Sequence, residues 1–392
     1  MVSFLSKFRN AIRVVLFGGA IVSLAACDPT LVTAPSTGTG GNSKPVDVAL
    51  LVPGGSGVGE LDAIALSLEN AARLAVADLN GVTVNLTVYN TRRDPGTAVN
   101  ATNQAISDGA DIILGPLDGE VAAAVGVAAR AANTNVLTFS NNTAVAGGNV
   151  FLLGQTFDDG ARRVAGYAAQ QGRSGVVVVH AQNVAGEAGR AAASSALAQS
   201  GLTLAGTSSY ENTLPGISAA IPGIRNTVSS SGADSIFLTS NTAGALPILV
   251  ELLPEGGVNP EETQYLGLAR WDLDPRLFTL AGAQGGWFAM PDRARSAAFS
   301  NRYVGAYAAS PHPLAFTAYD GIAIIGALWA QGGGDPLDSN AITRSQGFQG
   351  STGIVRLRAD GTNQRGLAIG SIVNGQITTL EAAPQGFSGS GF

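Results

Sequence analysis

The chain has 392 residues, 45% of them hydrophobic, and a formal charge of −6 at pH 7. This apolar content is normal for a packed globular protein and excludes wholesale disorder. With 28 acidic residues against 22 basic ones, the chain lacks the positive surface that nucleic acid requires, so we expect no nucleic-acid partner.

The N-terminus has the layout of a secretory signal peptide, which we place at residues 1–26. A basic start is followed by an uncharged, mostly apolar run from 14 to 26, shorter than the roughly 20 residues of a membrane-spanning helix. The Leu-Ala-Ala-Cys tetrad at 24–27 resembles the bacterial lipobox, and Cys27 is the only cysteine. The resemblance implies cleavage before Cys27 and attachment of a diacylglycerol to its thiol. The alternative is an ordinary signal peptide with an accidental cysteine.

Residues 27–45 are rich in Pro, Thr, Gly, Ser and Asn, which predicts a flexible tether from the lipid to the folded part. Several acyl chains together anchor firmly, since each buried CH₂ contributes about 0.8 kcal/mol. We therefore expect a periplasmic protein held to a membrane by its lipid. Asp28 resembles the residue that retains lipoproteins in the inner membrane of some bacteria, which favours that membrane here.

From residue 46 onward, short apolar runs alternate with helical patterns. The first half predicts strands at 46–52, 82–88, 112–114 and 136–139, with helices at about 60–75, 95–108 and 120–132. Asp94 and Pro95 supply the N-cap and the first-turn proline of the second helix.

The same rhythm restarts after residue 153. Strands are expected at 176–179, 202–207 and 235–238, with helices at 158–171, 186–200 and 217–229. After residue 285, the pattern predicts helices at 293–308 and 316–331 and strands at 353–357 and 367–373. Strands that alternate with helices predict parallel sheets covered on both faces, here in two similar α/β halves.

Five short motifs resemble one known family. In chain order they are the strand Val48–Pro53 with a glycine loop at 54–57, Asp94-Pro95 with Ala98, Gly115-Pro116-Leu117, Ala318-Tyr319-Asp320-Gly321, and Gly350-Ser351-Thr352-Gly353 with Asp360-Gly361. Over about residues 45–380 the chain resembles type I periplasmic binding proteins of the leucine/isoleucine/valine-binding family.

The resemblance implies two Rossmann-like lobes, each a parallel sheet flanked by helices, joined by three hinge crossings. Lobe one would comprise 46–153 plus 284–331, and lobe two 154–283 plus 332–380, with a disordered tail at 381–392. The ligand would lie between the lobes, at the carboxyl ends of the strands, where α/β sheets bind. Hinge closure would bury it.

Four candidate ligand contacts follow strands of lobe one. Ser56 lies in the glycine loop before a helix, where backbone N–H groups favour an anion, although the loop is equally consistent with a simple turn. Ser140 and Asn141 follow the strand 136–139. Asp118 stands where amino-acid binders of the family usually carry Ser or Thr. A ligand carboxylate buried beside it would be an unpaired charge, which costs about 3–5 kcal/mol. The alternative is that Asp118 caps the next helix.

The remaining candidates lie elsewhere in the chain. Ser240 and Asn241 follow the strand 235–238, and residues 239–245 contain no acid for a ligand's ammonium group. Trp271, between an Arg and an Asp, is a candidate cleft wall, with a salt bridge between its neighbours as the alternative. Tyr319 is a further candidate, although stabilisation of the lobe is an alternative role.

The sequence shows no catalytic constellation, so we expect no enzyme activity. His180 and His312 lie far apart, near no cysteine or carboxylate cluster, and neither is expected to bind metal. We expect no cofactor.

Two functions remain. The first is a solute-binding lipoprotein that presents a small polar ligand to an ABC permease. The second is a penicillin-binding-protein activator, which would contact a peptidoglycan synthase. Several details resemble that activator group: Gly115-Pro116-Leu117 with Val121, Phe139-Ser140-Asn141, Leu152-Leu153-Gly154, and Arg162-Arg163-Val164 with Tyr167.

Overall fold

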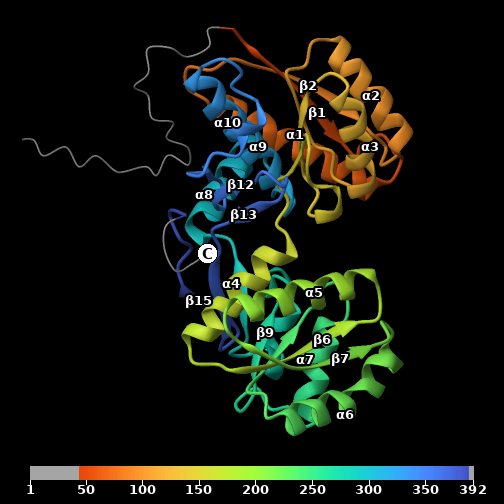
Figure 1. Ribbon diagram of the computed structural model, residues 1–392, viewed down its shortest axis with the longest axis vertical. Helices are drawn as coiled ribbons and strands as arrows, with labels where there is room; N and C mark the ends of the chain where they lie inside the picture. The colour runs from red at the N-terminus through yellow and green to blue at the C-terminus, as the bar shows by residue number, and fades with distance from the viewer. Residues whose placement is uncertain (1–43, 388–392) are drawn as a thin grey trace, which may run out of the picture. The chain divides into compact units, whose positions relative to one another are not determined.

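The structure, a computed structural model, describes residues 44–387 (Figure 1). The predicted signal peptide, the lipid site at Cys27 and nearly all of the predicted tether lie outside these residues. Within residues 44–387, no helix has the length and apolar character that crossing a membrane requires.

The first sheet of the described chain contains five parallel strands in the order β2-β1-β3-β4-β5. The strands are β1 (Val46–Val52), β2 (Val84–Asn90), β3 (Ile112–Leu114), β4 (Asn135–Thr138) and β5 (Val150–Leu152). The helices that cover it are α1 (Gly59–Asp78), α2 (Pro95–Ser107), α3 (Gly119–Arg130) and α9 (Ala315–Gln331).

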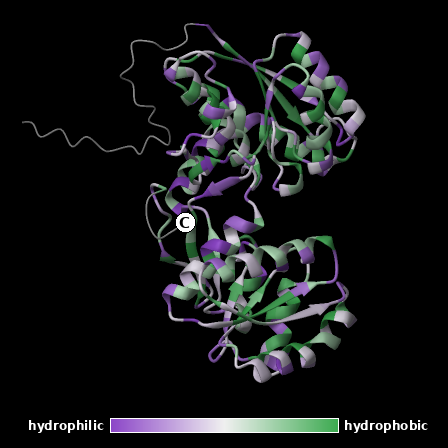
Figure 2. Cartoon of the chain, viewed as in Figure 1, coloured by the Kyte–Doolittle hydropathy of each residue, from purple (hydrophilic) through white to green (hydrophobic). Residues whose placement is uncertain are grey.

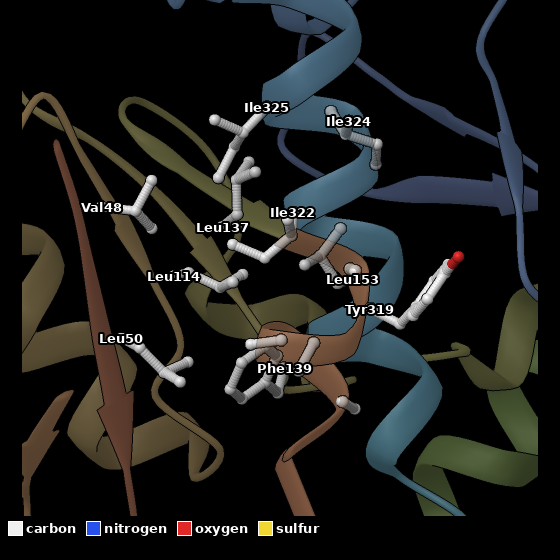
Figure 3. Close-up of a cluster of buried hydrophobic side chains, with 14 of the residues drawn as sticks. Val48, Leu50, Leu114, Leu137, Phe139, Leu153, Tyr319, Ile322, Ile324 and Ile325 are labelled. Carbon is white, nitrogen blue, oxygen red and sulfur yellow. The ribbon is translucent and has the colours of Figure 1, made fainter. Parts of the chain in front are cut away.

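Alternate residues of β1 serve two different cores, because successive side chains of a strand point to opposite faces. Val48 and Leu50 pack with α1 and α9, as Figure 3 shows for Ile322 and Ile325 of α9. Ala49 packs instead with residues of α2 and α3. Apart from Asp47 near its start, the strand is therefore apolar, as Figure 2 shows.

The second sheet has seven strands in the order β15-β14-β10-β9-β8-β6-β7. The central strands are parallel, and β14 and β15 run antiparallel at one edge. The strands are β6 (Gly175–Ala181), β7 (Thr203–Tyr210), β8 (Ser235–Leu238), β9 (Gln264–Gly267), β10 (Trp287–Met290), β14 (Ala368–Val373) and β15 (Gln376–Glu381). The main helices are α4 (Phe157–Gln170), α5 (Val184–Gln199), α6 (Leu214–Ser231) and α7 (Leu246–Glu255).

The two faces of this sheet are divided in the same way. Val176 and Val178 of β6 pack with α4 and α5, whereas Val177 and Val179 pack with α6 and α7. The prediction of two α/β lobes with parallel sheets flanked by helices is confirmed.

The described chain also contains three short antiparallel strands and two further α-helices. The strands are β11 (Phe348–Gly350), β12 (Gly353–Leu357) and β13 (Asn363–Arg365), and the helices are α8 (Arg293–Tyr307) and α10 (Ser339–Ile342). Phe299 of α8 and Val355 of β12 both belong to the α1–α9 core.

The structure corrects the predicted lobe boundaries. Strand β10 lies within the predicted lobe-one segment 284–331, but it pairs with β9 and β14 of the second sheet. Conversely, Ile342, Phe348 and Val355, predicted in lobe two, are buried in the first core. The alternation of elements predicts that strands exist, whereas the sheet that each strand joins depends on contacts distant in sequence.

The predicted disordered tail at 381–392 also needs correction in its described part. Ala383 is buried in the core of the second sheet. The guanidinium of Arg356 lies 4.4 Å from the centroid of the Phe387 ring. Residues 381–387 therefore make defined contacts.

Within residues 44–387 the chain passes between the two sheets three times: after β5, after β10 and after β13. Two buried arginines donate hydrogen bonds to groups in or near the segments that make these crossings. Arg365 donates to the Asp320 carboxylate (3.1 Å) and to the Leu153 carbonyl (2.5 Å). Arg163 donates to the Leu367 carbonyl at 2.6 Å. The first and third crossings are thus tied by charge-assisted hydrogen bonds.

Candidate ligand-binding site

Four parallel strands of the second sheet, β6 to β9, end at one edge, and the residues that follow line a hollow of about 130 Å³. Carboxyl edges of parallel sheets are where α/β proteins bind ligands. The polar residues that line the hollow are Asn183, Tyr210, Asn212, Thr239, Ser240 and Asn241. Ser240 and Asn241 were predicted from the sequence, and the structure brings them together here.

The hollow has neutral polar chemistry. The Tyr210 hydroxyl lies 2.5 Å from the Ser240 hydroxyl, and both residues are buried. Burial raises the pKa of Tyr210, and its hydrogen bond to Ser240 opposes that shift only in part, so the phenol stays neutral. Asn241 is exposed and presents an amide. None of the described residues that line this hollow carries a charge.

A glycine brings helix α5 onto the end of β6. A Cβ on Gly186 would lie 2.0 Å from the Ala181 carbonyl oxygen, so only glycine fits this approach. The Asn183 side chain caps the same helix by accepting from the Gly186 N–H at 2.7 Å. The floor of the hollow is therefore set by backbone contacts.

On the first sheet, the loops after β1 and β4 hold the predicted serines. The Ser140 hydroxyl accepts from the Asn142 N–H at 3.1 Å, and the Ser56 hydroxyl accepts from the Val58 N–H at 3.2 Å. Each hydroxyl shapes its own loop as an acceptor and keeps its proton available for a further bond. Asn141 is exposed beside Ser140.

A second hollow contains Asn141, Thr143 and Phe157. The rest of its lining consists of Asn142, Asp158 and mainly small residues of α5. Phe157 and Ala185 also line the hollow at the ends of β6–β9. The predicted Asn141 is thus brought close to the lobe that carries Ser240.

Asp118 has a partner that the sequence analysis missed. It occupies the N-cap position of α3 but makes no capping bond. Its Oδ1 accepts from Arg93 Nε at 2.9 Å and from Nη2 at 2.5 Å. This ion pair raises the pKa of Arg93. The alternative that the Asp118 side chain caps α3 is therefore wrong, and its contact with a ligand stays a prediction.

One sequence feature would have pointed to this pair. Arg92 and Arg93 lie one residue beyond the end of β2 and precede Asp94, the cap of α2. Both arginines have left-handed backbone conformations, with φ of 54° and 56°. Two cations at the carboxyl end of a strand are a binding-site pattern, but only the folded chain shows that one of them meets Asp118.

Trp271 is a core residue and not a cleft wall, contrary to the prediction. It is fully buried and stacks on Phe288 at a centroid distance of 5.8 Å. A Cβ on Gly267 or on Gly286 would lie 2.2 Å from the indole. Its neighbours Arg270 and Asp272 form the alternative salt bridge, at 2.5 Å.

Tyr319 also has a structural role, which is the alternative that the sequence left open. Its side chain is buried in the first core, where its ring lies edge-on to that of Phe299 at a centroid distance of 5.3 Å. Figure 3 shows this side chain on α9. Its hydroxyl donates to the Asp78 carboxylate at 2.5 Å, and burial raises its pKa. The adjacent Asp320 accepts from the Ser351 N–H at 2.6 Å. The predicted ligand contact at Tyr319 is therefore wrong.

Neither His180 nor His312 joins a cluster of possible metal ligands in the described chain. In the part of the chain that the structure describes, no group of three His, Cys, Asp or Glu residues is arranged to hold a metal ion. His180 instead lies 3.4 Å from Glu187.

These features define a class: a two-sheet α/β protein with polar, uncharged side chains at the carboxyl edge of one parallel sheet. The periplasmic binding protein family model matches residues 45–376. The chain belongs to the periplasmic binding protein family, which confirms the resemblance drawn from its motifs.

Solved structures show the same fold. A protein from Rhodospirillum rubrum, described as a branched-chain amino acid ABC transporter, has a TM-score of 0.73 at 17% identity, over 86% of this chain and 100% of that one. A substrate-binding protein from Desulfitobacterium hafniense in complex with Leu has a TM-score of 0.64 at 15% identity, over 86% and 100%.

A third structure shares the fold with a different ligand. A solute-binding protein from R. palustris in complex with benzoate has a TM-score of 0.58 at 16% identity, over 88% of this chain and 98% of that one. No curated protein sequence matches the chain. At these identities the likeness concerns the fold alone.

Proposed function

We propose that the chain is a solute-binding protein that captures a small polar ligand and presents it to an ABC permease. The observation that carries the proposal is the hollow at the carboxyl ends of β6–β9, lined by the Tyr210–Ser240 pair and by asparagine amides. Membership of the periplasmic binding protein family supports it. The neutral polar lining suits recognition of a ligand, and we propose binding without catalysis.

The lining argues against an ordinary amino acid as the ligand. An α-ammonium group enclosed in this hollow would meet hydroxyls and amides but no carboxylate among the described lining residues. An uncompensated buried charge costs about 3–5 kcal/mol, which lowers affinity by a factor of roughly one hundred to several thousand. The structural neighbours include binders of Leu and of benzoate. The site chemistry here favours a ligand without an ammonium group.

We further propose that the protein works in the periplasm while anchored by lipid on Cys27. The tetrad at 24–27 supports the anchor, and Asp28 supports retention in the inner membrane. Cys27→Ser should release the protein from the membrane fraction, with its signal peptide uncleaved. A variant that stays firmly attached would contradict the anchor, and wild-type protein found mainly in the outer membrane would contradict inner-membrane retention.

Activation of a peptidoglycan synthase remains a prediction with less support. Two residues that carried that resemblance have contacts inside the protein. Arg163 binds the Leu367 carbonyl and Glu381, and Tyr167 packs edge-on against Trp287 at 4.9 Å. These contacts account for those residues without a protein partner.

The first test is native mass spectrometry of the purified protein. We expect a copurified small molecule that is lost on denaturation and whose amount falls in Asn241→Ala. The control is Asn226→Ala, an exposed asparagine on α6 of the same lobe. Isothermal titration with leucine, isoleucine and valine should show no binding at micromolar concentrations. Micromolar affinity for any of the three would show that the ammonium argument is wrong.

A further inference from the structure

Arg93 is held in place at the carboxyl end of β2, on the first sheet. Two of its nitrogens, Nε and Nη2, bind one oxygen of Asp118, which follows β3. Its side chain is 49% exposed, against 22% for Asp118. In the described part of the chain, Nη1 has no hydrogen-bond partner. The guanidinium is thus fixed on one side and free to donate on the other.

Asp118 places this guanidinium beside the loop of predicted ligand contacts. Gly119, next to Asp118, approaches Asn142 so closely that a Cβ there would lie 2.8 Å from the amide nitrogen. Asn142 in turn donates its N–H to Ser140. The ends of β2, β3 and β4 therefore bring a cation, an amide and a hydroxyl to one edge of the sheet.

A second cation lies close by. Arg92 is exposed, and its side chain forms no hydrogen bond or ion pair with the described residues; its Nε would lie 3.7 Å from a Cβ on Gly55. Nearby acids are engaged: Asp118 with Arg93, and Asp62 with the Gly55 N–H at 2.8 Å. Glu120, in the first turn of α3, is exposed.

The backbone adds an independent indication. Consecutive non-glycine residues in the left-handed region cost free energy, and such residues cluster where a site needs a side chain aimed in one direction. Arg92 and Arg93 both adopt this conformation. An arginine immobilised by a carboxylate has already lost the rotamer freedom that binding would otherwise cost.

We infer that the ligand is an organic carboxylate with an uncharged body, and that Arg93 donates to its carboxylate while Asp118 positions Arg93. The inference rests on the proposed function: it names the ligand class and adds Arg93, at the strand ends of the first sheet, to the ligand contacts proposed at the hollow. The uncharged hollow of the second sheet receives the body, where Tyr210 and Ser240 supply hydroxyls. Arginine suits the anionic end because its planar fork matches a carboxylate.

The experiment compares acids with their own amides. Isothermal titration uses 4-hydroxybenzoate and 4-methylpentanoate, the two corresponding amides, and L-leucine, which adds an ammonium group to the second acid. We expect at least one acid to bind, with its amide about tenfold or more weaker and leucine weaker than 4-methylpentanoate. Arg93→Gln should weaken the acid by about tenfold or more.

Arg73→Gln is the matched control. Arg73 is 50% exposed and pairs with Glu69 on α1, away from the strand ends, so its loss should leave affinity unchanged. An amide that binds as tightly as its acid, an unchanged affinity in Arg93→Gln, or two acids that both fail to bind at millimolar concentration would each overturn the ligand class. A copurified neutral or cationic molecule would overturn the class while preserving the proposed function. Absence of any bound molecule in all tests would overturn both.

Discussion

In the first sheet, the loops beyond the strand ends carry charges, among them the ion pair of Arg93 with Asp118 and the exposed Arg92. In the second sheet, the corresponding loops carry hydroxyls and amides, and the lining residues of the hollow there are uncharged. Both edges are built from the same parallel topology, with alternate residues of each strand facing opposite cores. The fold therefore supplies the position of a site, and the loop residues decide its chemistry.

The difference extends to how each half is stabilised. The crossings near the first sheet are tied by the buried Asp320–Arg365 pair. The second sheet, like the first, has an apolar core, in which Trp271 of the loop that follows β9 is fully buried. Mutations that remove a charge in one half, or volume in the other, should separate these two modes of stabilisation.

The largest expected effect comes from the charged half. Asp320→Ala removes a carboxylate that is fully buried and leaves Arg365 without its partner, which should lower the free energy of unfolding by about 3–5 kcal/mol. Urea unfolding followed by circular dichroism measures this. Glu69→Ala breaks the exposed pair with Arg73 and should cost less than about 1 kcal/mol. If both variants lowered the free energy of unfolding equally, the claim that burial makes the Asp320–Arg365 pair more important would be wrong.

In the apolar half, Trp271→Ala should have a comparable effect by a different route. Removing an indole packed on Phe288 leaves a cavity, and such truncations cost about 3–5 kcal/mol. Leu214→Ala is the control because Leu214 is 60% exposed, and its change should stay within about 0.5 kcal/mol. A small effect at Trp271 would return this residue to the candidate ligand contacts.

A smaller effect is expected at the neutral edge. Tyr210→Phe removes one hydroxyl of the pair with Ser240 and should cost about 0.5–1.5 kcal/mol in stability. If the pair also contacts ligand, the same variant weakens ligand binding in titration, whereas Asn226→Ala leaves binding unchanged. A loss of stability above about 3 kcal/mol would instead indicate a purely structural role.

The smallest expected effect is a pH dependence at Asp159, near the first crossing. Burial raises its pKa above the usual value, so the folded state holds this proton more tightly than the unfolded state does. The contribution of Asp159 to stability therefore improves as the pH falls from above its folded pKa toward its unfolded value near 3.8.

The measurement is the difference in unfolding free energy between wild type and Asp159→Asn at pH 7 and at pH 4.5. At the lower pH, the unfolding free energy of wild type should rise relative to that of the variant. A difference that does not change with pH, or that changes in the opposite sense, would contradict the assigned shift. The capping box with Thr156 is the local contact to preserve, and asparagine retains an acceptor for it.

For much of the candidate site, the sequence predicts which loop holds each residue. Ser140, Asn141, Ser240 and Asn241 follow predicted strands, and parallel strands deliver such residues to one edge. The roles of Trp271 and Tyr319 were not predictable in the same way. An aromatic residue after a strand has the same local pattern whether it faces a ligand or a core, and burial depends on what packs against it from elsewhere.

The sequence by itself determined the local structure of this protein. The strands at 112–114, 235–238 and 353–357 have the predicted bounds, and Asp94 caps α2 by accepting from the Thr97 N–H at 2.6 Å. Hydrophobic periodicity and capping act between residues a few positions apart, so they can be recognised from the sequence.

Only the tertiary structure decided which sheet receives β10 and which partner neutralises Asp118. Strand β10 joins the second sheet although the chain continues directly into α8, which packs on the first core. Arg93 and Asp118 are 25 positions apart and meet because β2 and β3 flank β1 in one sheet. Such contacts depend on strand order and on the turns of several loops at once, which no single stretch of sequence contains.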